Sequence, residues 1–194
     1  MTAIQAYTDF ADSAVLLPVS ILLVVWLWLR QSKATALWWV AAVALCVGTT
    51  VIFKVYFGVC PPAADLRSPS GHTGFGTLVY GALTTIVAAE SPARHRLVVL
   101  AVGAAVILAI GLSRIAVNAH TAVEVAFGFV VGGAALALFM AGYLRHRSAP
   151  VTLAWLIVAA LLLMGIFHGQ QLRAEEFLHK LGFHLRQDGM ACVM

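Results

Sequence analysis

Six apolar runs, each near the length of a membrane span, limit what this chain can fold into. They cover about 14–29, 34–57, 69–90, 97–116, 120–144 and 151–167. A helix needs about 20 mostly apolar residues to cross the hydrocarbon core of a bilayer. Charged residues make up 10% of the 194 residues, whereas a soluble domain averages about 25%. The sequence therefore predicts an all-α integral membrane bundle of six transmembrane helices.

The C-terminal tail, about 168–194, has a different pattern from the rest of the chain. Leu178, Leu181 and Leu185 share one helical face, and charged residues are interspersed between them. This pattern predicts a short amphipathic helix at the membrane surface, interrupted near Gly182. The sequence has no internal repeat, so we expect a single membrane domain over residues 1–194.

Basic residues in the turns predict how the bundle is oriented in the membrane. The turns after the first, third and fifth runs share one side and carry Arg30, Lys33, Arg94, Arg96, Arg145 and Arg147. The positive-inside rule places these turns in the cytoplasm, and it places both termini and the other turns outside. In a bacterial inner membrane, which we expect, the outer side is the periplasm. The net charge of +4 comes without a basic tail, so nucleic-acid binding is not expected.

The three cysteines, Cys46, Cys60 and Cys192, have no C-x-x-C spacing, so neither a zinc motif nor a redox motif is expected. In the predicted orientation Cys60 and Cys192 share the outer, oxidising side, while Cys46 lies inside a span. A disulfide between Cys60 and Cys192 would tie the tail to the rest of the outer surface.

Two polar stretches, 67–72 and 113–124, stand out at the predicted outer ends of the spans. Together with a nearby lysine they form a group in which cations outnumber acids: Lys54, Arg67, His72, Arg114, His120 and Glu124. Such a group attracts an anion. At a helix start the N–H groups of Ser70 and Gly71 can bind phosphate, and glycine allows a close approach. Arg114 can give a phosphate two hydrogen bonds.

The two histidines in these stretches suggest different chemical roles. His120 and Glu124 are four residues apart, so on a helix the carboxylate can hold the imidazole in one tautomer and raise its basicity. His72 remains available as a general acid. The stretches offer few carboxylates and no closely spaced histidine pair, so a metal ion is not expected. The pattern predicts a phosphoryl-transfer site without a metal or other cofactor.

These residues resemble the type-2 phosphatidic acid phosphatase family, which carries the blocks K-x6-R-P, P-S-G-H and S-R-x5-H-x3-D. The second block is complete at 69–72. The third has its spacing intact over 113–124, with Glu124 in place of aspartate. The first block departs from the pattern, because Pro61 stands at the arginine position after Lys54.

The resemblance implies a membrane phosphatase of lipid phosphates that works through a phosphohistidine and needs no metal. By position, His120 would be the nucleophile, Glu124 its orienting acid and His72 the acid for the leaving group. The phosphate would be bound by Lys54, Ser70, Gly71 and Arg114, with Arg67 a candidate for the missing arginine. The substrate could be undecaprenyl diphosphate, phosphatidylglycerophosphate, phosphatidate or phosphorylated lipid A, and the oligomeric state stays open.

Two other functions fit the same residues. A lipid phosphotransferase would keep the site and pass the phosphate to another lipid. A non-enzymatic lipid-binding or transport protein would account for the altered first block, and it predicts no turnover of any lipid phosphate.

Overall fold

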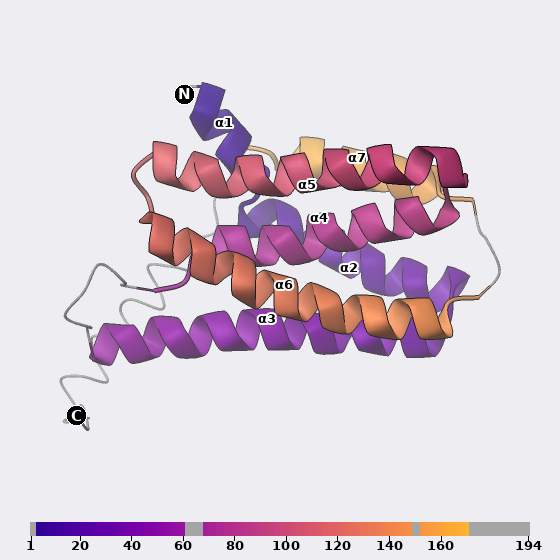
Figure 1. Cartoon of the computed structure of the whole chain (residues 1–194), viewed down its shortest axis with the longest axis horizontal. Coiled ribbons are helices and arrows are strands. Elements are labelled where there is room, and N and C mark those ends of the chain that lie inside the picture. Colours follow the sequence, from indigo (N-terminus) through magenta and orange to yellow (C-terminus); the bar gives the residue numbers. More distant parts are fainter. Residues whose placement is uncertain (1–2, 61–67, 149–151, 171–194) are drawn as a thin grey trace.

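A computed structural model describes residues 3–60, 68–148 and 152–170 of the chain (Figure 1). Every regular element in these ranges is a helix, as the sequence predicted. The helices are α1 (Ala3–Asp9), α2 (Ser13–Arg30), α3 (Lys33–Val59), α4 (Gly71–Glu90), α5 (Ala93–Ala116), α6 (Ala122–His146) and α7 (Ala154–Phe167). Helices α2 to α7 match the six predicted runs, and α1 was not predicted.

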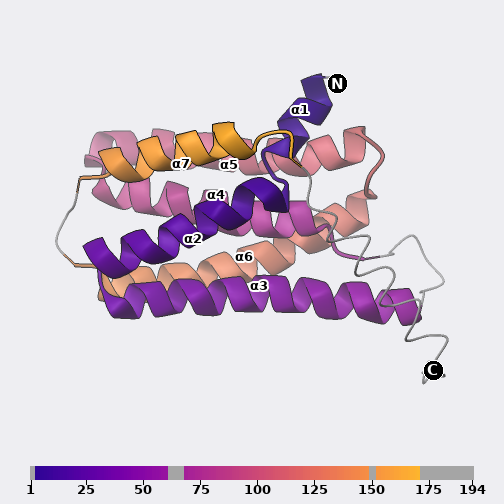
Figure 2. The same cartoon turned by 180° about the vertical axis from the view of Figure 1, so that it is seen from behind.

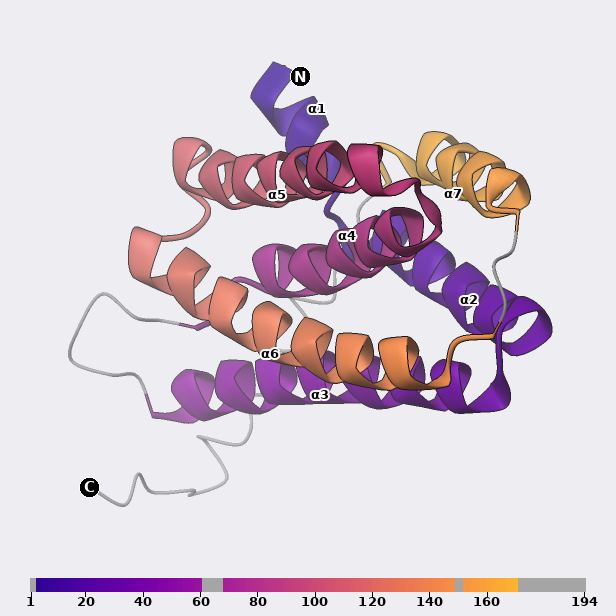
Figure 3. The same ribbon diagram turned by 45° about the vertical axis from the view of Figure 1, so that its right-hand side comes forward.

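Helix α4 lies in the middle of the bundle. It contacts α2, α3, α5 and α6, and Figure 3 shows it between α5 on one side and α3 and α6 on the other. Helix α7 packs against α2 on the face seen in Figure 2. Because α4 is covered by neighbouring helices, its residues meet protein rather than lipid, and the helix can carry threonines, glycines and a histidine along its length.

Glycines let α6 pack very closely against α4. A Cβ atom at Gly128 would lie 2.7 Å from the Ser70 carbonyl oxygen, and one at Gly132 would collide with the Gly74 carbonyl oxygen. The G-x-x-x-G spacing thus removes side-chain volume where the two backbones meet, as such motifs do between membrane helices. This close approach brings the beginning of α6 to the beginning of α4.

The number of membrane spans differs in part from the prediction. Within the described residues, four helical segments are long and apolar enough to cross a membrane: 4–30, α3, α5 and α6. Helix α7 has 14 described residues, about 21 Å of helix, and a span needs about 30 Å. Helix α4 has 20 residues and sufficient length, but its polar residues keep it outside the set. Several apolar helices indicate an integral membrane protein, and the predicted set of six spans is only partly confirmed.

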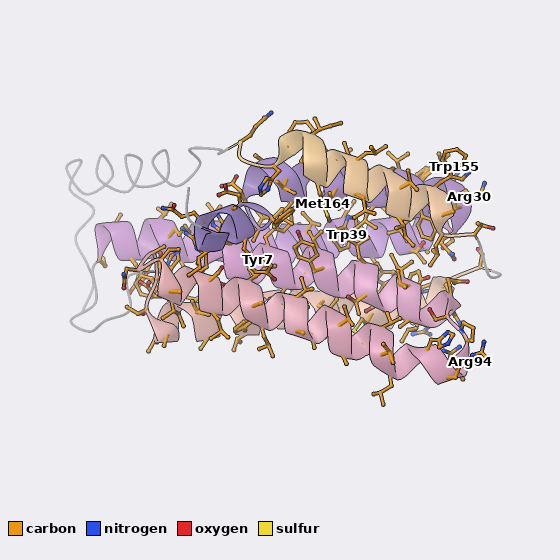
Figure 4. All side chains as sticks on the ribbon, turned by 90° about the horizontal axis from the view of Figure 1, so that it is seen from above. Tyr7, Arg30, Trp39, Arg94, Trp155 and Met164 are labelled. Carbon is orange, nitrogen blue, oxygen red and sulfur yellow. The ribbon has the colours of Figure 1, made fainter. Side chains whose placement is uncertain are left out.

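The three basic turns lie together at one end of the bundle, on the right in Figure 1. The Ser32 hydroxyl donates to the His146 carbonyl oxygen at 2.9 Å, and Arg147 Nη1 donates to the Ala89 carbonyl oxygen at 3.3 Å. Figure 4 labels Arg30 and Arg94 at this same end. The two motif-bearing stretches lie at the opposite end. The predicted tail helix is outside the described residues.

Candidate functional site

The first turn of α6 holds His120 and Glu124 together. Thr121 is the N-cap of this helix and forms a capping box with Glu124: the Thr121 hydroxyl accepts from the Glu124 amide, and Glu124 Oε2 accepts from the Thr121 amide at 3.1 Å. The same Oε2 lies 2.9 Å from His120 Nδ1. Both side chains are buried, with 8% and 5% of their surface exposed. The predicted contact between these two residues is therefore present.

This contact assigns the nitrogens of the His120 ring. An ionised carboxylate can only accept hydrogen bonds, so Nδ1 carries the proton shared with Glu124. The neutral ring then has its lone pair on Nε2. His120 thus offers one nucleophilic nitrogen, held in a fixed direction by a buried carboxylate.

Glu124 also joins the two motif-bearing stretches. Its Oε1 accepts from the Ser68 amide at 3.2 Å, and its carbonyl oxygen accepts from the Ser70 amide at 3.0 Å. One residue therefore orients His120, caps α6 and holds the approach to α4. The family pattern has aspartate at this position. Glutamate is the residue that closes a capping box. Its extra methylene lets the carboxylate reach both the Thr121 amide and the Ser68 amide.

The turn between α5 and α6 brings Arg114 to His120. The amides of Ala119 and His120 both donate to the Arg114 carbonyl oxygen, at 3.1 and 3.3 Å. Asn118 makes this fold-back possible with a φ of 55°, a left-handed conformation that asparagine tolerates better than most residues. Arg114, in the last turn of α5, is therefore held next to the histidine that it precedes by six positions.

Ser70 begins α4 and is fully buried. Its hydroxyl caps the helix by accepting from the Thr73 amide at 3.4 Å and from the Thr73 hydroxyl at 3.0 Å. The Ser70 amide is already bound to Glu124. A helix leaves its first amides outside its own hydrogen-bond ladder. The Ser70 hydroxyl and amide are therefore both used in contacts within the protein, and the amides of Gly71 and His72 belong to the first turn of α4.

Lys54 comes to the same place from α3. Its Cε lies 3.7 Å from the position that a Cβ atom at Gly71 would occupy, so the lysine stem runs against the first residue of α4. The site residues thus lie at or next to the ends of four helices, at one end of the bundle: Lys54, Gly71, His72, Arg114 and His120. Arg67 and Pro61 are outside the described residues, so the structure gives them no position.

The sequence pattern did not predict the carboxylate next to His72. Asp12 Oδ2 lies 3.3 Å from His72 Nε2, and the two side chains are 9% and 15% exposed. Asp12 is also the N-cap of α2, since its Oδ1 accepts from the Ala14 amide at 2.8 Å. The available signal was an Asp-Ser pair before the first apolar run, which is typical of an N-cap. Nothing in the sequence pattern connects that acid with a histidine 60 residues later.

The remaining polar groups bear on two earlier expectations. Within the described ranges, no group of three or more His, Cys, Asp or Glu side chains is arranged to hold a metal ion. Cys46 is buried and free, as expected inside a span, and Cys60 is disulfide-bonded. Cys192 lies outside the described residues, so its pairing with Cys60 stays a prediction.

Part of this chain is similar in sequence to known proteins. The chain is 26% identical over 167 residues to an uncharacterized 22.5 kDa protein in the cps region of Klebsiella pneumoniae, an alignment that covers 82% of this chain and 79% of the relative. No solved structure matches. The model of the PAP2 superfamily matches residues 63–148, which contain both motif-bearing stretches and the helices between them. This segment is therefore similar to the PAP2 superfamily, and the similarity supports phosphatase activity on a phosphate ester.

Proposed function

We propose that the protein is an integral membrane phosphatase that hydrolyses a phosphate monoester or diphosphate of a lipid. The observation that carries this proposal is the 2.9 Å contact between His120 Nδ1 and Glu124 Oε2, because it leaves the lone pair of the neutral ring on Nε2 and orients the ring. The backbone of the turn holds Arg114 beside His120, and Lys54 lies against the first residue of α4. These groups and the first amides of α4 would supply the positive charge and hydrogen bonds that a phosphate needs.

In the first half of the reaction, His120 Nε2 attacks the phosphorus atom. As the N–P bond forms, the bond between phosphorus and the lipid oxygen breaks. His72, in its protonated form, gives its proton to that oxygen, so the lipid leaves as a neutral alcohol. Glu124 stabilises the positive charge that arises on the His120 ring. The developing charge on the phosphoryl oxygens is met by Lys54, Arg114 and the first amides of α4.

In the second half, water attacks the phosphorus atom of the phosphohistidine. His72 is now neutral and takes a proton from that water. The N–P bond breaks, inorganic phosphate leaves, and the lone pair returns to His120 Nε2. Both histidines are then in their starting states, and the cycle uses the side chains alone, with no metal ion or cofactor.

The helical bundle is what favours a lipid as the substrate. The site lies at the end of several apolar helices, so a headgroup phosphate can reach it while the chains stay in the bilayer. The lipids named from the sequence, from undecaprenyl diphosphate to phosphorylated lipid A, all present a phosphate at that depth. The test is phosphate release from a panel of these lipids by the purified protein in detergent.

Two outcomes of this panel support other functions. Phosphate that leaves the substrate only when an acceptor lipid is added indicates a phosphotransferase. No turnover of any lipid phosphate, with binding retained, indicates a lipid-binding protein and contradicts the proposed phosphatase.

The site faces the outside of the membrane in this proposal, which is the periplasm in a bacterial inner membrane. The support is the gathering of the basic turns at the other end of the bundle, because basic turns prefer the cytoplasm. Cysteines placed at His95 and His146 should resist a membrane-impermeant thiol reagent in intact cells and react after lysis. Labelling in intact cells would reverse the orientation.

A further inference from the structure

We infer that Asp12 is a positioning residue for His72, so that the segment before α2 is a working part of the active site. The inference rests on the proposed function, in which His72 moves the proton. Asp12 lies outside the 63–148 segment that matches the superfamily model. The structure brings its Oδ2 to 3.3 Å from His72 Nε2.

The two oxygens of Asp12 have different neighbours. Oδ1 accepts from the Ala14 amide and caps α2, while Oδ2 faces His72. Capping does not need a charge, because asparagine and serine cap helices about as well as aspartate. Burying a carboxylate is costly unless it has a partner. Capping alone therefore does not explain the charge of Asp12, whereas the histidine ring beside it does.

The segment that carries Asp12 is attached to the same helices as the rest of the site. The Tyr80 hydroxyl, on α4, donates to the Phe10 carbonyl oxygen at 2.7 Å. The Thr8 hydroxyl donates to the Ser113 hydroxyl at 3.0 Å, next to Arg114 in the sequence. These contacts hold residues 8–12 against both α4 and α5, so Asp12 keeps a constant position relative to the His72 backbone.

The chemical consequence concerns which nitrogen of His72 exchanges the proton. With Nε2 directed at Asp12, Nδ1 is left to face the leaving oxygen. The contact with the carboxylate fixes the direction of the ring and prevents its rotation. Asp12 therefore acts through His72 and does not touch the substrate. Glu124 has the same relation to His120, so each histidine has its own carboxylate.

The test compares substrates with different leaving groups. Asp12→Asn keeps a capping oxygen and removes the charge, and Asp12→Ser also keeps a cap. A proton donor matters for an alkyl phosphate, whose alkoxide is a poor leaving group, and matters little for p-nitrophenyl phosphate. We expect both variants to lose about 10- to 100-fold in kcat/KM on phosphatidate, because the general acid is then poorly positioned. On p-nitrophenyl phosphate we expect a loss of under about threefold.

A matched control and a double variant separate positioning from structure. Asp9→Asn removes another buried carboxylate from the same segment and should leave both activities within about twofold of the parent. The double variant Asp12→Asn/His72→Ala should be no slower on phosphatidate than His72→Ala alone, because the two changes remove one function.

The outcomes are distinct. Equal losses on both substrates, or a loss that adds to that of His72→Ala, would overturn the role of Asp12 while the phosphatase itself stands. A parent protein that hydrolyses neither substrate would overturn the proposed function, and the inference about Asp12 with it.

Discussion

The two histidines of the site are held in opposite ways. His120 takes its carboxylate from the first turn of the helix that follows it, four residues along the chain, within a capping box that local sequence dictates. His72 takes its carboxylate from the N-terminal segment, across a contact that exists only when α2 and α4 pack together. One pair could be read from spacing and the other could not. A sequence motif therefore identifies supporting residues that are close in sequence, such as Glu124. Supporting residues such as Asp12 can come from distant parts of the chain.

Removing His120 should have the largest effect, because no other group in the proposed scheme attacks phosphorus. His120→Ala should show no phosphate release above the uncatalysed background and no trapped phosphoenzyme after mild quenching with labelled substrate. Turnover near the rate of the parent protein would mean that His120 is not the nucleophile.

Removing the charge of Glu124 should come next. Glu124→Gln keeps the length and one capping acceptor but not the negative charge, so it should lower kcat by about 10³- to 10⁴-fold, as loss of an orienting carboxylate does elsewhere. Glu124→Asp is the matched comparison: it keeps the charge and shortens the reach to the Ser68 amide, and it should retain more activity. A glutamine variant as active as the aspartate variant would show that charge is not what Glu124 supplies.

Removing His72 should cost about 10²- to 10⁴-fold on a lipid monophosphate, the usual range for a general acid. The loss should be smaller on a lipid diphosphate, because phosphate is a stable leaving group without a proton. Phosphoenzyme should still form. Equal losses on the two substrates would contradict the division of labour between the histidines.

Loosening the contact between α4 and α6 should have the smallest effect, on stability rather than chemistry. Gly132→Ala places a methyl group against the Gly74 carbonyl oxygen, and overpacking of this kind costs about 1–3 kcal/mol. Gly133→Ala is the control, since a Cβ there meets no atom within 4 Å and alanine favours the helix. Thermal unfolding in detergent should show a lower midpoint for the first variant and an unchanged or higher one for the second. Equal unfolding midpoints for the two variants would mean that the contact between Gly132 and the Gly74 carbonyl oxygen has room for a methyl group.

Much of the fold could be predicted from the apolar runs. A run of about 20 apolar residues forms a helix that is buried in protein or exposed to lipid, and few other structures are open to it. Residue type also agrees with the observed helix starts, since Asp12, Ser32, Ser70 and Thr121 are of types that favour the N-cap and are the N-caps in the structure. The central place of α4 was not predicted. Its lower apolarity is a consequence of being surrounded by protein, and which helix is surrounded depends on packing among all of them.

The sequence by itself determined the contact between His120 and Glu124, because Thr121 and Glu124 have the residue types and spacing of a capping box, which turns the carboxylate back toward the residues before the helix. It also determined the alternation that gathers the basic turns at one end. Only the tertiary structure decided that Asp12 meets His72, that Lys54 lies against Gly71 and that Glu124 holds the Ser68 and Ser70 amides. Those contacts join parts of the chain whose distance is set by how close α2, α3 and α6 come to α4. That distance depends on side-chain volume at the crossings, such as the absence of side chains at Gly128 and Gly132, and no spacing along one helix encodes it.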